Sequence, residues 1–398
     1  MDITIKPSPL SGAIDAIPSK SQAHRMLILA AFADRQTELY VPETNRDMDA
    51  TTACLCALGA DILRTQTGYL VTPAKIVPAS ASLPCQDSGS TLRFLLPVAG
   101  ALGVDATFHM TGRLPKRPLS PLWEEMERMG CSLSRPSEDT IRCTGRLSPG
   151  DYHIDGGVSS QFVTGLILAF CLMDGKSHLC IEGQLQSAPY VTMTQRACSL
   201  FGKDTNNFTV SAGPLRSPGK LAVEGDWSNA AFFLAAKALG SGLTVGNLDW
   251  NSPQGDRACA ALLPALTKES ACISAADIPD LVPILAVTAA ASHGAVFTDI
   301  QRLRLKESDR VASVLAMLEA LGGKAEADES TLTVFGTGLK GGTVDSRNDH
   351  RIAMSAAIAA TVCKEPVTIL GAECVEKSYP KFFEDYQKLG GTYEQYLR

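Results

Sequence analysis

The residues of this chain that are best suited to chemistry are arginines that lie inside or beside apolar segments. Arg93 lies within LRFLLPVAG, and Arg351 follows His350 in NDHRIAMSAA. Burying an unpaired guanidinium is very costly, so each of these arginines must face an anionic ligand or a carboxylate. The planar guanidinium matches both, because it donates two parallel hydrogen bonds to a carboxylate or phosphate. For either stretch alone, an internal salt bridge and a ligand explain the pattern equally well.

Three further stretches concentrate positive charge. Residues 17–25, IPSKSQAHR, precede a long apolar run, and RLPKRPLSPL forms a Pro-bounded loop before a helix. RLRLKESDR is predicted to alternate Arg302, Arg304 and Lys306 on one strand face and then to enter a helix at Glu307. Five cationic stretches together favour a small ligand with several negative charges over five unrelated salt bridges.

Carboxylates near these cations are candidates for proton transfer. Asp277 and Asp280 bracket a proline in DIPDL, at the head of an apolar helix where an aspartate is usually a cap. Glu307 directly follows Lys306, so it is either a partner of the helix dipole or a general acid/base tuned by cations. Among the histidines only His350 is a site candidate, whereas His24 is expected to pack or to face solvent.

Several other classes of chemistry lack support in the sequence. No GxGxxG opens a strand–helix unit, and neither GxxxxGK[ST] nor HExxH occurs, which weakens nucleotide and metal readings. The twelve cysteines form no C-x-x-C pair and no zinc spacing, so we interpret them as reduced core thiols.

Composition restricts the class of protein further. The net charge is −6, and no basic tract or Lys/Arg cluster of the chain suggests nucleic acid, so a nucleic-acid partner is not expected. A length of 398 residues with 45% hydrophobic residues predicts a globular protein of two to three domains. MDITIKP has no signal-peptide pattern, and the apolar runs are too short to cross a membrane, so a cytoplasmic protein without a membrane partner is expected.

The elements that must position these residues recur six times along the chain. In each repeat a short polar turn leads into a helix of small apolar residues, as in SKSQAHRMLILAAFA and DSGSTLRFLLPVAGAL. The markers that we use for the six helix starts are Ser19, Ser88, Ser159, Ser228, Pro279 and Asn348. They are separated by 69, 71, 69, 51 and 69 residues, so only the fourth repeat is short.

A second, amphipathic helix and short alternating stretches such as YLVTP, TLTVF and PVTIL complete each repeat. The first helices are apolar around their whole circumference, which predicts burial on all sides. If three such helices form an inner layer, with the amphipathic helices and the sheets outside, the six repeats make an α/β (α+β) protein of two similar halves. Several helix N-termini that point to one place would form a site for an anion. Each polar residue at a helix start could also serve only as the N-cap of its own helix.

At this level of detail the chain resembles a known family. The motifs SKSxxxR, SGSTLR, KRP, SSQF, SAPY, IPD, LKESDR, NDHR and EKSYP occur in the order found in the family of 5-enolpyruvylshikimate-3-phosphate synthase, or 3-phosphoshikimate 1-carboxyvinyltransferase. They extend from about residue 17 to residue 381. The resemblance implies the two-domain enolpyruvyl transferase fold, in which each domain holds three βαβαββ units. It implies one discontinuous domain of residues 1–16 and 223–398, and a second domain of residues 17–222.

The family reaction transfers the enolpyruvyl group of phosphoenolpyruvate to the 5-hydroxyl of shikimate 3-phosphate through a tetrahedral intermediate. By resemblance, Asp280 would accept the hydroxyl proton, Glu307 would exchange a proton with the enol carbon, and Lys20 would contact both substrates. Shikimate 3-phosphate would bind Lys20, Ser21, Arg25, Ser159, Ser160, Gln161, Ser187, Tyr190, Asp280 and Lys306. Phosphoenolpyruvate would bind Lys20, Gly89, Arg93, Arg117, Gln161, Arg310, His350, Arg351 and Lys377. The resemblance implies no cofactor, no metal and a monomer.

Three departures from the family pattern stand out. Asp87 occupies a position where many relatives have Asn, and Arg302 lies where some relatives place an Asn. The short fourth repeat predicts a missing strand or trimmed loops around residues 205–275.

Two alternatives remain beside this reading. The related transferase that acts on UDP-N-acetylglucosamine carries a cysteine on a mobile loop, but no cysteine lies between residues 86 and 130 here. A noncatalytic anion-binding paralogue is the other, and the presence of Asp280, Glu307 and Lys20 argues against it.

Overall fold

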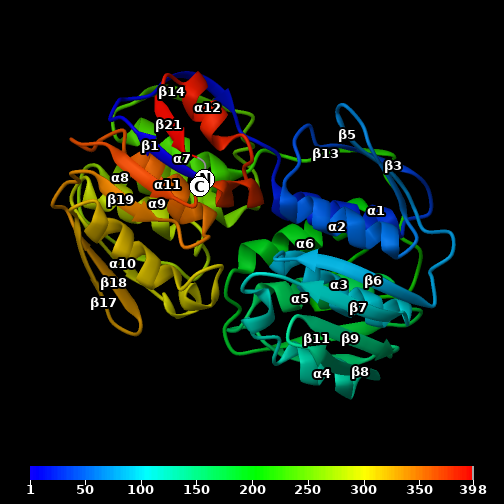
Figure 1. The fold of residues 1–398 in the computed structure, drawn as a ribbon. Helices are drawn as coiled ribbons and strands as arrows, with labels where there is room; N and C mark the ends of the chain where they lie inside the picture. Colours follow the sequence, from blue (N-terminus) through cyan, green and yellow to red (C-terminus); the bar gives the residue numbers. More distant parts are fainter. Residues whose placement is uncertain (397–398) are drawn as a thin grey trace. The chain divides into compact units, whose positions relative to one another are not determined.

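The chain folds into two compact units, each with its own hydrophobic core. The computed structural model describes residues 1–396. Unit 1 consists of Met1–Ile17 and the chain from Glu224 onward, and unit 2 is Pro18–Val223. The chain thus starts in unit 1, builds all of unit 2 and returns (Figure 1). The expected ranges, 1–16 with 223–398 and 17–222, change domain one residue before each of these passages.

Twelve α-helices alternate along the described chain as a first and a second helix in each of six repeats. The first helices are α1 (Lys20–Ala31), α3 (Gly89–Leu102), α5 (Ser160–Phe170), α7 (Trp227–Ala238), α9 (Val282–Ala290) and α11 (His350–Ala359). The second helices are α2 (Arg46–Ala57), α4 (Leu122–Arg128), α6 (Ala188–Leu200), α8 (Cys259–Leu266), α10 (Arg310–Ala320) and α12 (Phe382–Lys388). The predicted pair of helices is therefore present in all six repeats.

The sheets share one order of strands. The first and second strands of a repeat are parallel, the fourth is antiparallel to the second, and the third pairs with the fourth. Four sheets are complete: β13 (Lys220–Ala222)-β3 (Thr37–Tyr40)-β5 (Gly68–Thr72)-β4 (Asp61–Arg64); β6 (Ser80–Gln86)-β7 (Asp105–Met110)-β9 (Thr140–Gly145)-β8 (Cys131–Ser137); β15 (Ala271–Ser274)-β16 (Ala295–Thr298)-β18 (Thr331–Phe335)-β17 (Lys324–Ala327); and β19 (Gly342–Asp345)-β20 (Val367–Leu370)-β1 (Asp2–Ile5)-β21 (Tyr393–Tyr396).

Two repeats have fewer strands. The third consists of β10 (Asp151–Asp155), β11 (Ser177–Glu182) and the short β12 (Thr209–Val210). The fourth has only β2 (Ser11–Asp15) and β14 (Gly242–Gly246), which run parallel. Its short spacing in the sequence therefore corresponds to the absence of two strands among the described residues.

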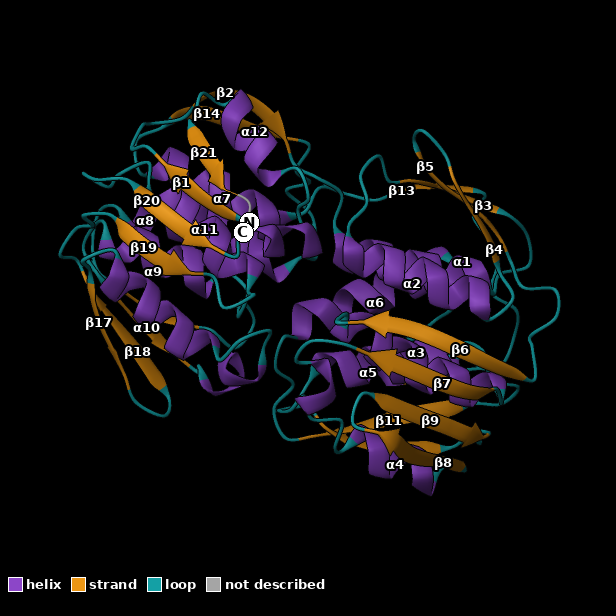
Figure 2. Ribbon diagram, in the orientation of Figure 1, coloured by secondary structure: helices purple, strands orange, loops and turns teal. Residues whose placement is uncertain are grey.

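In each unit the helices lie inside and the strands outside (Figure 2). All nine residues of α9 are buried, as are the last nine of α1, because these helices expose no polar face. Within unit 2, α3 and α5 pack so closely that a Cβ on Gly165 would lie 2.2 Å from the backbone oxygen of Arg93.

Three of the six marker residues are also the N-caps of their helices. Ser19, Ser88 and Ser159 are N-caps whose side chains accept hydrogen bonds from the first turn. Asp226 caps α7 in place of Ser228, and Asp349 caps α11 in place of Asn348. No side chain caps α9, which begins three residues after Pro279.

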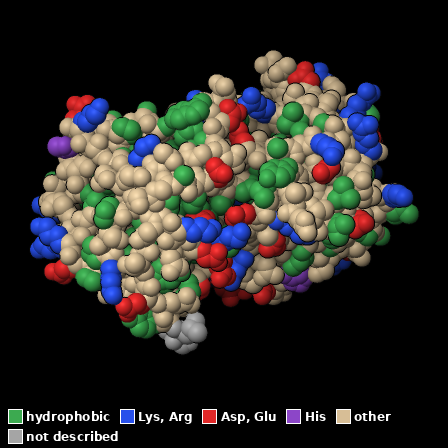
Figure 3. Space-filling view, turned by 90° about the horizontal axis from the view of Figure 1, so that it is seen from above, with side chains coloured by type: hydrophobic (Ala, Val, Ile, Leu, Met, Phe, Trp, Pro, Cys, Tyr) green, Lys and Arg blue, Asp and Glu red, His purple; other side chains and the backbone are tan. Residues whose placement is uncertain are grey.

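The surface carries no extended region of one charge on the face of the described residues that Figure 3 displays, where acidic and basic side chains are mixed. Within residues 1–396 no helix is both long and apolar enough to cross a membrane. All twelve cysteines are free thiols, and nine of them are buried.

The tight contact between α3 and α5 gives a first prediction. Gly165→Ala should lower the free energy of unfolding by about 1–3 kcal/mol or more, because the added methyl group meets a backbone oxygen that cannot move alone. Gly100→Ala, in α3, is the matched control. Its new methyl group meets only the side chains of Cys131 and Leu147, which can move more easily than a backbone oxygen, so it should lower the free energy of unfolding by less. Urea unfolding measures both. A Gly165→Ala protein as stable as the parent would contradict this account of the packing.

Candidate functional site

Unit 2 gathers its predicted site residues at the N-termini of its first helices. Lys20 and Ser21 are the first two residues of α1, Gly89 opens α3, and Ser160 and Gln161 open α5. The N–H groups of a first turn have no partner within the helix, and the dipole there is positive. Each of these positions therefore favours an anion before any side-chain charge is counted.

Gly89 allows two guanidinium groups to approach the N-terminus of α3. A Cβ at Gly89 would lie 2.7 Å from Nη1 of Arg117 and 2.8 Å from Nη1 of Arg93. Arg93 reaches this point because it lies one turn after Gly89, and helical side chains point back towards the N-terminus. Arg117 comes from the end of the short 3₁₀ helix η1 (Leu114–Lys116). Any larger residue would collide with these cations.

Gln161 joins α5 to this pair of arginines. Its Oε1 accepts a hydrogen bond of 3.0 Å from Nη1 of Arg93, and its Nε2 donates to Oγ of Ser90 at 3.0 Å. Nη2 of Arg93 donates to the carbonyl of Pro118 at 3.2 Å. These bonds fix the buried Arg93 side chain, so the start of α3 is a preformed cationic site.

Arg25 is a buried cation whose hydrogen-bond partners are all neutral. Its Nε donates to Oγ1 of Thr194 at 2.8 Å, and its Nη2 donates to Oγ1 of Thr164 at 3.2 Å and to the carbonyl of Tyr190 at 3.0 Å. Nη1 donates to the carbonyl of Ser21, one turn earlier in α1. Burial lowers the pKa of Arg25 to about 10, so its charge persists at neutral pH.

Lys20 and His24 of α1 differ in their surroundings. Nζ of Lys20 lies 2.8 Å from Oδ2 of Asp47, so an internal ion pair holds this lysine. His24 is buried, and its Nδ1 lies 2.7 Å from Oγ1 of Thr51. Burial lowers the pKa of His24 to about 3, so the ring is neutral and packs in the core.

The remaining predicted residues of unit 2 lie near Arg25 and α5. Ser187 is buried and adopts a left-handed conformation (φ 55°) just before α6. Tyr190, in the first turn of α6, supplies the carbonyl that Arg25 binds. Oγ of Ser159 accepts from the N–H of Gln161 at 3.2 Å, so its hydroxyl also serves as the cap of α5.

Unit 1 contains a second cluster, centred on Asp280. Three cations surround this carboxylate: Nη1 of Arg310 at 2.8 Å, Nη2 of Arg351 at 3.2 Å and Nζ of Lys306 at 3.4 Å. Burial alone raises the pKa of Asp280, but Arg351, Lys306 and Arg310 together hold it well below its usual range. Asp280 is therefore ionised at neutral pH and able to accept a hydrogen bond or a proton.

Arg310 links three carboxylates in this cluster. Besides Asp280, its Nη2 contacts Oε2 of Glu307 at 2.7 Å and its Nε contacts Oδ2 of Asp349 at 3.0 Å. Arg310 has no exposed surface, and Asp349 has none either. The guanidinium thus positions Glu307 and Asp280 relative to each other, which suits a pair of proton-transfer groups.

Lys306 is the cation of this cluster whose charge is most easily lost. Burial lowers its pKa to about 8, and the nearby Arg310 lowers it too, whereas Asp280 opposes this shift. A lysine with such a pKa is partly neutral in mildly basic solution.

Three predicted residues of unit 1 lie on or beside α11. His350 and Arg351 are the first two residues of this helix and are buried. Nη1 of Arg351 donates to the carbonyl of Asp280 at 3.3 Å in addition to the ion pair. Lys377 is buried at the end of the 3₁₀ helix η5 (Ala372–Lys377), which packs against α11.

The predicted strand through Arg302 and Arg304 is wrong. Residues Gln301–Leu305 form the 3₁₀ helix η4, and α10 begins only at Arg310, after its cap Asp309. A helical turn does not alternate side chains between two faces, so Arg304 instead donates to the carbonyl of Asp328 at 2.8 Å. Glu307 lies before the helix and pairs with Arg310, which favours the acid/base interpretation over the dipole one.

Three aspartates in these clusters are not among the predicted site residues. Asp47 pairs with Lys20, and Asp349 with Arg310. Asp256, buried in the 3₁₀ helix η3 (Gly255–Ala258), has its pKa raised to about 6, first by burial and then by the charge of Asp280. The only sequence signal for Asp349 was its place in NDHR, and an isolated aspartate such as Asp47 or Asp256 gave none.

The two clusters can bind ligands with several negative charges. Within residues 1–396 no group of His, Cys, Asp and Glu side chains is arranged to hold a metal ion. The charges that these clusters offer to phosphate or carboxylate are guanidinium and ammonium groups.

The chain is similar to known proteins over nearly its whole length. The family model of EPSP synthase (3-phosphoshikimate 1-carboxyvinyltransferase) matches residues 5–269 and 264–386. Proteins named 3-phosphoshikimate 1-carboxyvinyltransferase from Clostridium novyi and Clostridium kluyveri are each 35% identical to the chain. The alignments cover 99% of this chain in both cases, and 99% and 98% of the respective relatives.

Solved structures show the same fold. An EPSP synthase from Acinetobacter baumannii superposes with a TM-score of 0.80 at 24% identity, covering 99% of this chain and 100% of that one. The enolpyruvyl transferase NikO from Streptomyces tendae gives a TM-score of 0.74 at 19% identity, covering 99% and 98%. The predicted enolpyruvyl transferase fold is confirmed by these likenesses.

The setting of Lys306 gives a prediction that needs no ligand. In protein labelled with ¹³C at lysine Cε, its signal should titrate near pH 8, because burial disfavours the charged form. Asp280→Asn should move this midpoint lower, since the Asp280 charge raises the pKa of Lys306. Lys306→Arg identifies the signal by its loss. A midpoint above pH 10 would show that Lys306 is not buried as described.

Proposed function

The chain belongs to the EPSP synthase (3-phosphoshikimate 1-carboxyvinyltransferase) family, and we propose that it transfers the enolpyruvyl group of phosphoenolpyruvate to shikimate 3-phosphate. The products are 5-enolpyruvylshikimate 3-phosphate and phosphate, on the route to chorismate and the aromatic amino acids. The observation that carries this proposal is the cluster in which Arg310 joins Asp280 and Glu307 beside Lys306 and Arg351. It combines proton-transfer groups with the charges that anionic substrates require.

In the proposed reaction the 5-hydroxyl oxygen of shikimate 3-phosphate forms a bond to C2 of phosphoenolpyruvate. Asp280 accepts the hydroxyl proton, and Glu307 gives a proton to C3, so a tetrahedral ketal phosphate results. The bond between C2 and the phosphate oxygen then breaks with its electron pair going to the oxygen, and Glu307 takes back a proton from C3. Phosphate leaves with the proton that Asp280 had accepted, so both carboxyl groups return to their starting states. Asp280 suits its role because the surrounding cations keep it ionised.

We assign the remaining residues by the charge that each would meet. Lys20, in its ion pair with Asp47, would contact both substrates. Shikimate 3-phosphate would bind Ser21, Arg25, Ser159, Ser160, Gln161, Ser187, Tyr190, Asp280 and Lys306. Phosphoenolpyruvate would bind Gly89, Arg93, Arg117, Gln161, Arg310, His350, Arg351 and Lys377. The close approach of Arg93 and Arg117 to Gly89 supports the second assignment, because two cations at a helix N-terminus suit a phosphate.

We also propose that units 1 and 2 are the two domains of this enzyme. Each has three repeats and one of the two clusters. The substrates are small molecules, and the cations would stabilise developing negative charge without an organic cofactor or metal. A cytoplasmic location fits the free thiols of all twelve cysteines.

The direct test follows phosphate release from phosphoenolpyruvate with shikimate 3-phosphate as acceptor. Release should depend on shikimate 3-phosphate, and UDP-N-acetylglucosamine should not replace it. Release only with UDP-N-acetylglucosamine would identify the other transferase. Tight binding of shikimate 3-phosphate without any turnover would instead identify a noncatalytic paralogue.

The proton-transfer roles predict how two variants behave. Asp280→Asn and Glu307→Gln should each lower kcat by about 10²–10⁴-fold, with much smaller changes in KM, because the lost group acts on a proton in the transition state. Glu326→Gln removes an exposed carboxylate on β17 and should keep parental turnover. Thermal unfolding checks that each variant is folded. Parental kcat in both cluster variants would refute the assignment.

A further inference from the structure

The helices of the fourth repeat lack the cover that outer strands give to helices in other repeats. In the second repeat β9 packs on α3 and β8 on α4, and in the fifth β18 packs on α9 and β17 on α10. Among the described residues the fourth repeat has only β2 and β14, so no third or fourth strand covers α7 and α8. Leu234, Ala238 and Ala260 of these helices are accordingly only partly buried.

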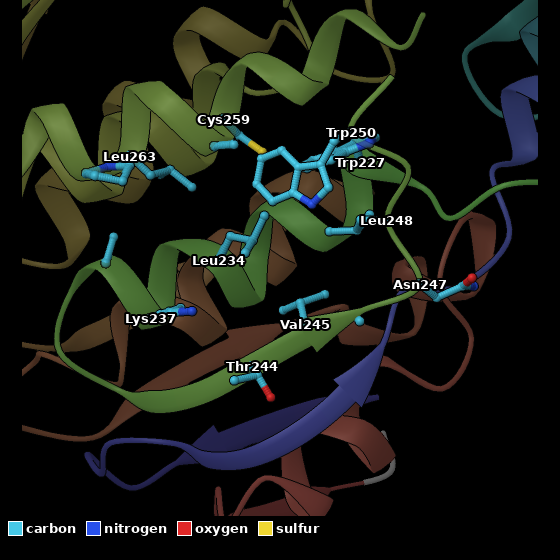
Figure 4. A pocket seen from close by; sticks show the side chains of 14 residues that line it. Trp227, Leu234, Lys237, Thr244, Val245, Asn247, Leu248, Trp250, Cys259 and Leu263 are labelled. Carbon is cyan, nitrogen blue, oxygen red and sulfur yellow. The ribbon is translucent and has the colours of Figure 1, made fainter. Parts of the chain in front are cut away.

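A cavity of about 670 Å³ lies at this place, between α7, α8 and β14 (Figure 4). Its volume is within the range of small-molecule sites, about 300–1,000 Å³. The apolar part of its walls includes Trp227, Leu234, Val245, Leu248, Trp250 and Leu263. Such walls favour a ligand with an apolar body, because each contact removes apolar surface from water.

Two of the three tryptophans of the chain lie at one end of the cavity. Trp227 is fully buried, whereas Trp250 is 64% exposed. Their ring centroids are 5.1 Å apart, and the ring planes meet at 72°. An exposed indole that already packs on a buried one offers a surface to a further flat ring, since aromatic rings stabilise each other in offset-stacked and edge-to-face pairs.

A single positive charge lies at the other end. Of the described residues that line the cavity, Lys237 alone is charged. Trp227, Leu234 and Lys237 follow one side of α7, and the ten residues from Trp227 to Lys237 span about 15 Å along the helix axis. Figure 4 shows Leu234 between the two ends. The cavity therefore fits an elongated ligand with an aromatic ring and one negative charge, which an ammonium group can bind.

We propose that this cavity binds an aromatic carboxylate in which a flexible link joins the ring to the acid group. The ring lies against Trp250 and Trp227, and the carboxylate meets the ammonium group of Lys237. No residue of the cluster around Asp280 lines this cavity, so the two sites are distinct. The proposal does not depend on the proposed reaction.

The walls of the cavity also hold the two passages of chain between unit 1 and unit 2. Near the first passage, Nδ2 of Asn247 donates to the carbonyl of Ala16 at 3.2 Å. Near the second, the N–H of Trp227 donates to Oε1 of Gln254 at 3.0 Å, and Nε2 of Gln254 donates to the carbonyl of Gly225 at 2.8 Å. A ligand that orders Asn247 and Trp227 should therefore reduce local opening of the backbone at both passages.

Displacement of 8-anilinonaphthalene-1-sulfonate tests the class of ligand. This aromatic anion absorbs tryptophan emission, so its binding in the cavity should quench the fluorescence of Trp227 and Trp250. The acid 4-phenylbutyrate should displace it and restore the emission. The amide 4-phenylbutyramide has the same ring and link without the charge, and it should bind about fivefold more weakly. An amide that displaces the probe as well as the acid does would overturn the assignment of a carboxylate.

Lys237→Gln and Trp250→Ala test where the acid binds. Both side chains are exposed, so neither change should unfold the protein. Lys237→Gln should abolish the difference between acid and amide, and Trp250→Ala should weaken both by about three- to tenfold. Lys268→Gln removes an exposed ammonium group just after α8, outside the cavity, and should bind as the parent does. Parental binding in both cavity variants would refute the site.

Hydrogen exchange tests the effect on the passages. The N–H of Ala16 donates to the carbonyl of Gly246 at 3.0 Å, and that of Asp226 to the carbonyl of Ile17 at 2.8 Å. Both amides should exchange more slowly when 4-phenylbutyrate is bound, whereas those of β18, in another sheet of unit 1, should not change. Binding without slower exchange at Ala16 and Asp226 would overturn the link to the passages. No quenching by the probe and no binding of 4-phenylbutyrate would refute the proposal as a whole.

Discussion

Buried positive charge is the constraint on which the rest of this structure depends. Arg25, Arg93, Arg310 and Arg351 are each at most 3% exposed, although a guanidinium loses much hydration free energy on burial. Unit 1 offsets this cost with carboxylates, because Arg310 alone contacts three of them. Arg25 in unit 2 has only neutral oxygens around it, so the protein holds it charged at a cost that an anionic ligand would offset.

The repeated architecture explains how these charges are held. In each first helix the apolar side chains are buried and hold the helix in place. The N–H groups of its first turn have no partner within the helix, so they remain able to bind an anion. Close packing refines this placement, since Gly165 lets α5 approach the backbone of Arg93, and Gly89 lets Arg93 and Arg117 approach α3. Small residues thus serve the site as directly as charged ones do.

Local patterns in the sequence were sufficient to predict the helices and the buried arginines. Apolar periodicity predicts all six pairs of helices. Arg93 and Arg351 stand out because they lie in apolar runs, where burying an unpaired guanidinium costs much free energy. The sequence does not predict the 3₁₀ helix through Arg302, because basic and apolar residues alternate in RLRLK as they do in a strand. Only the tertiary surroundings of this segment determine its conformation. The ion pair of Lys20 with Asp47 joins residues 27 positions apart, and no local pattern reports such a contact.

The short fourth repeat shows which parts of a repeat the site requires. None of the candidate site residues lies on a third or fourth strand; they lie at helix starts and in the turns between elements. The two clusters therefore do not need the two strands that this repeat lacks. They do need the first helices, whose N-termini carry several of their residues. The missing strands instead leave apolar side chains of α7 and α8 beside a cavity of about 670 Å³. The repeat thus separates two demands on one fold: helix starts hold the charges, and outer strands cover the apolar helices.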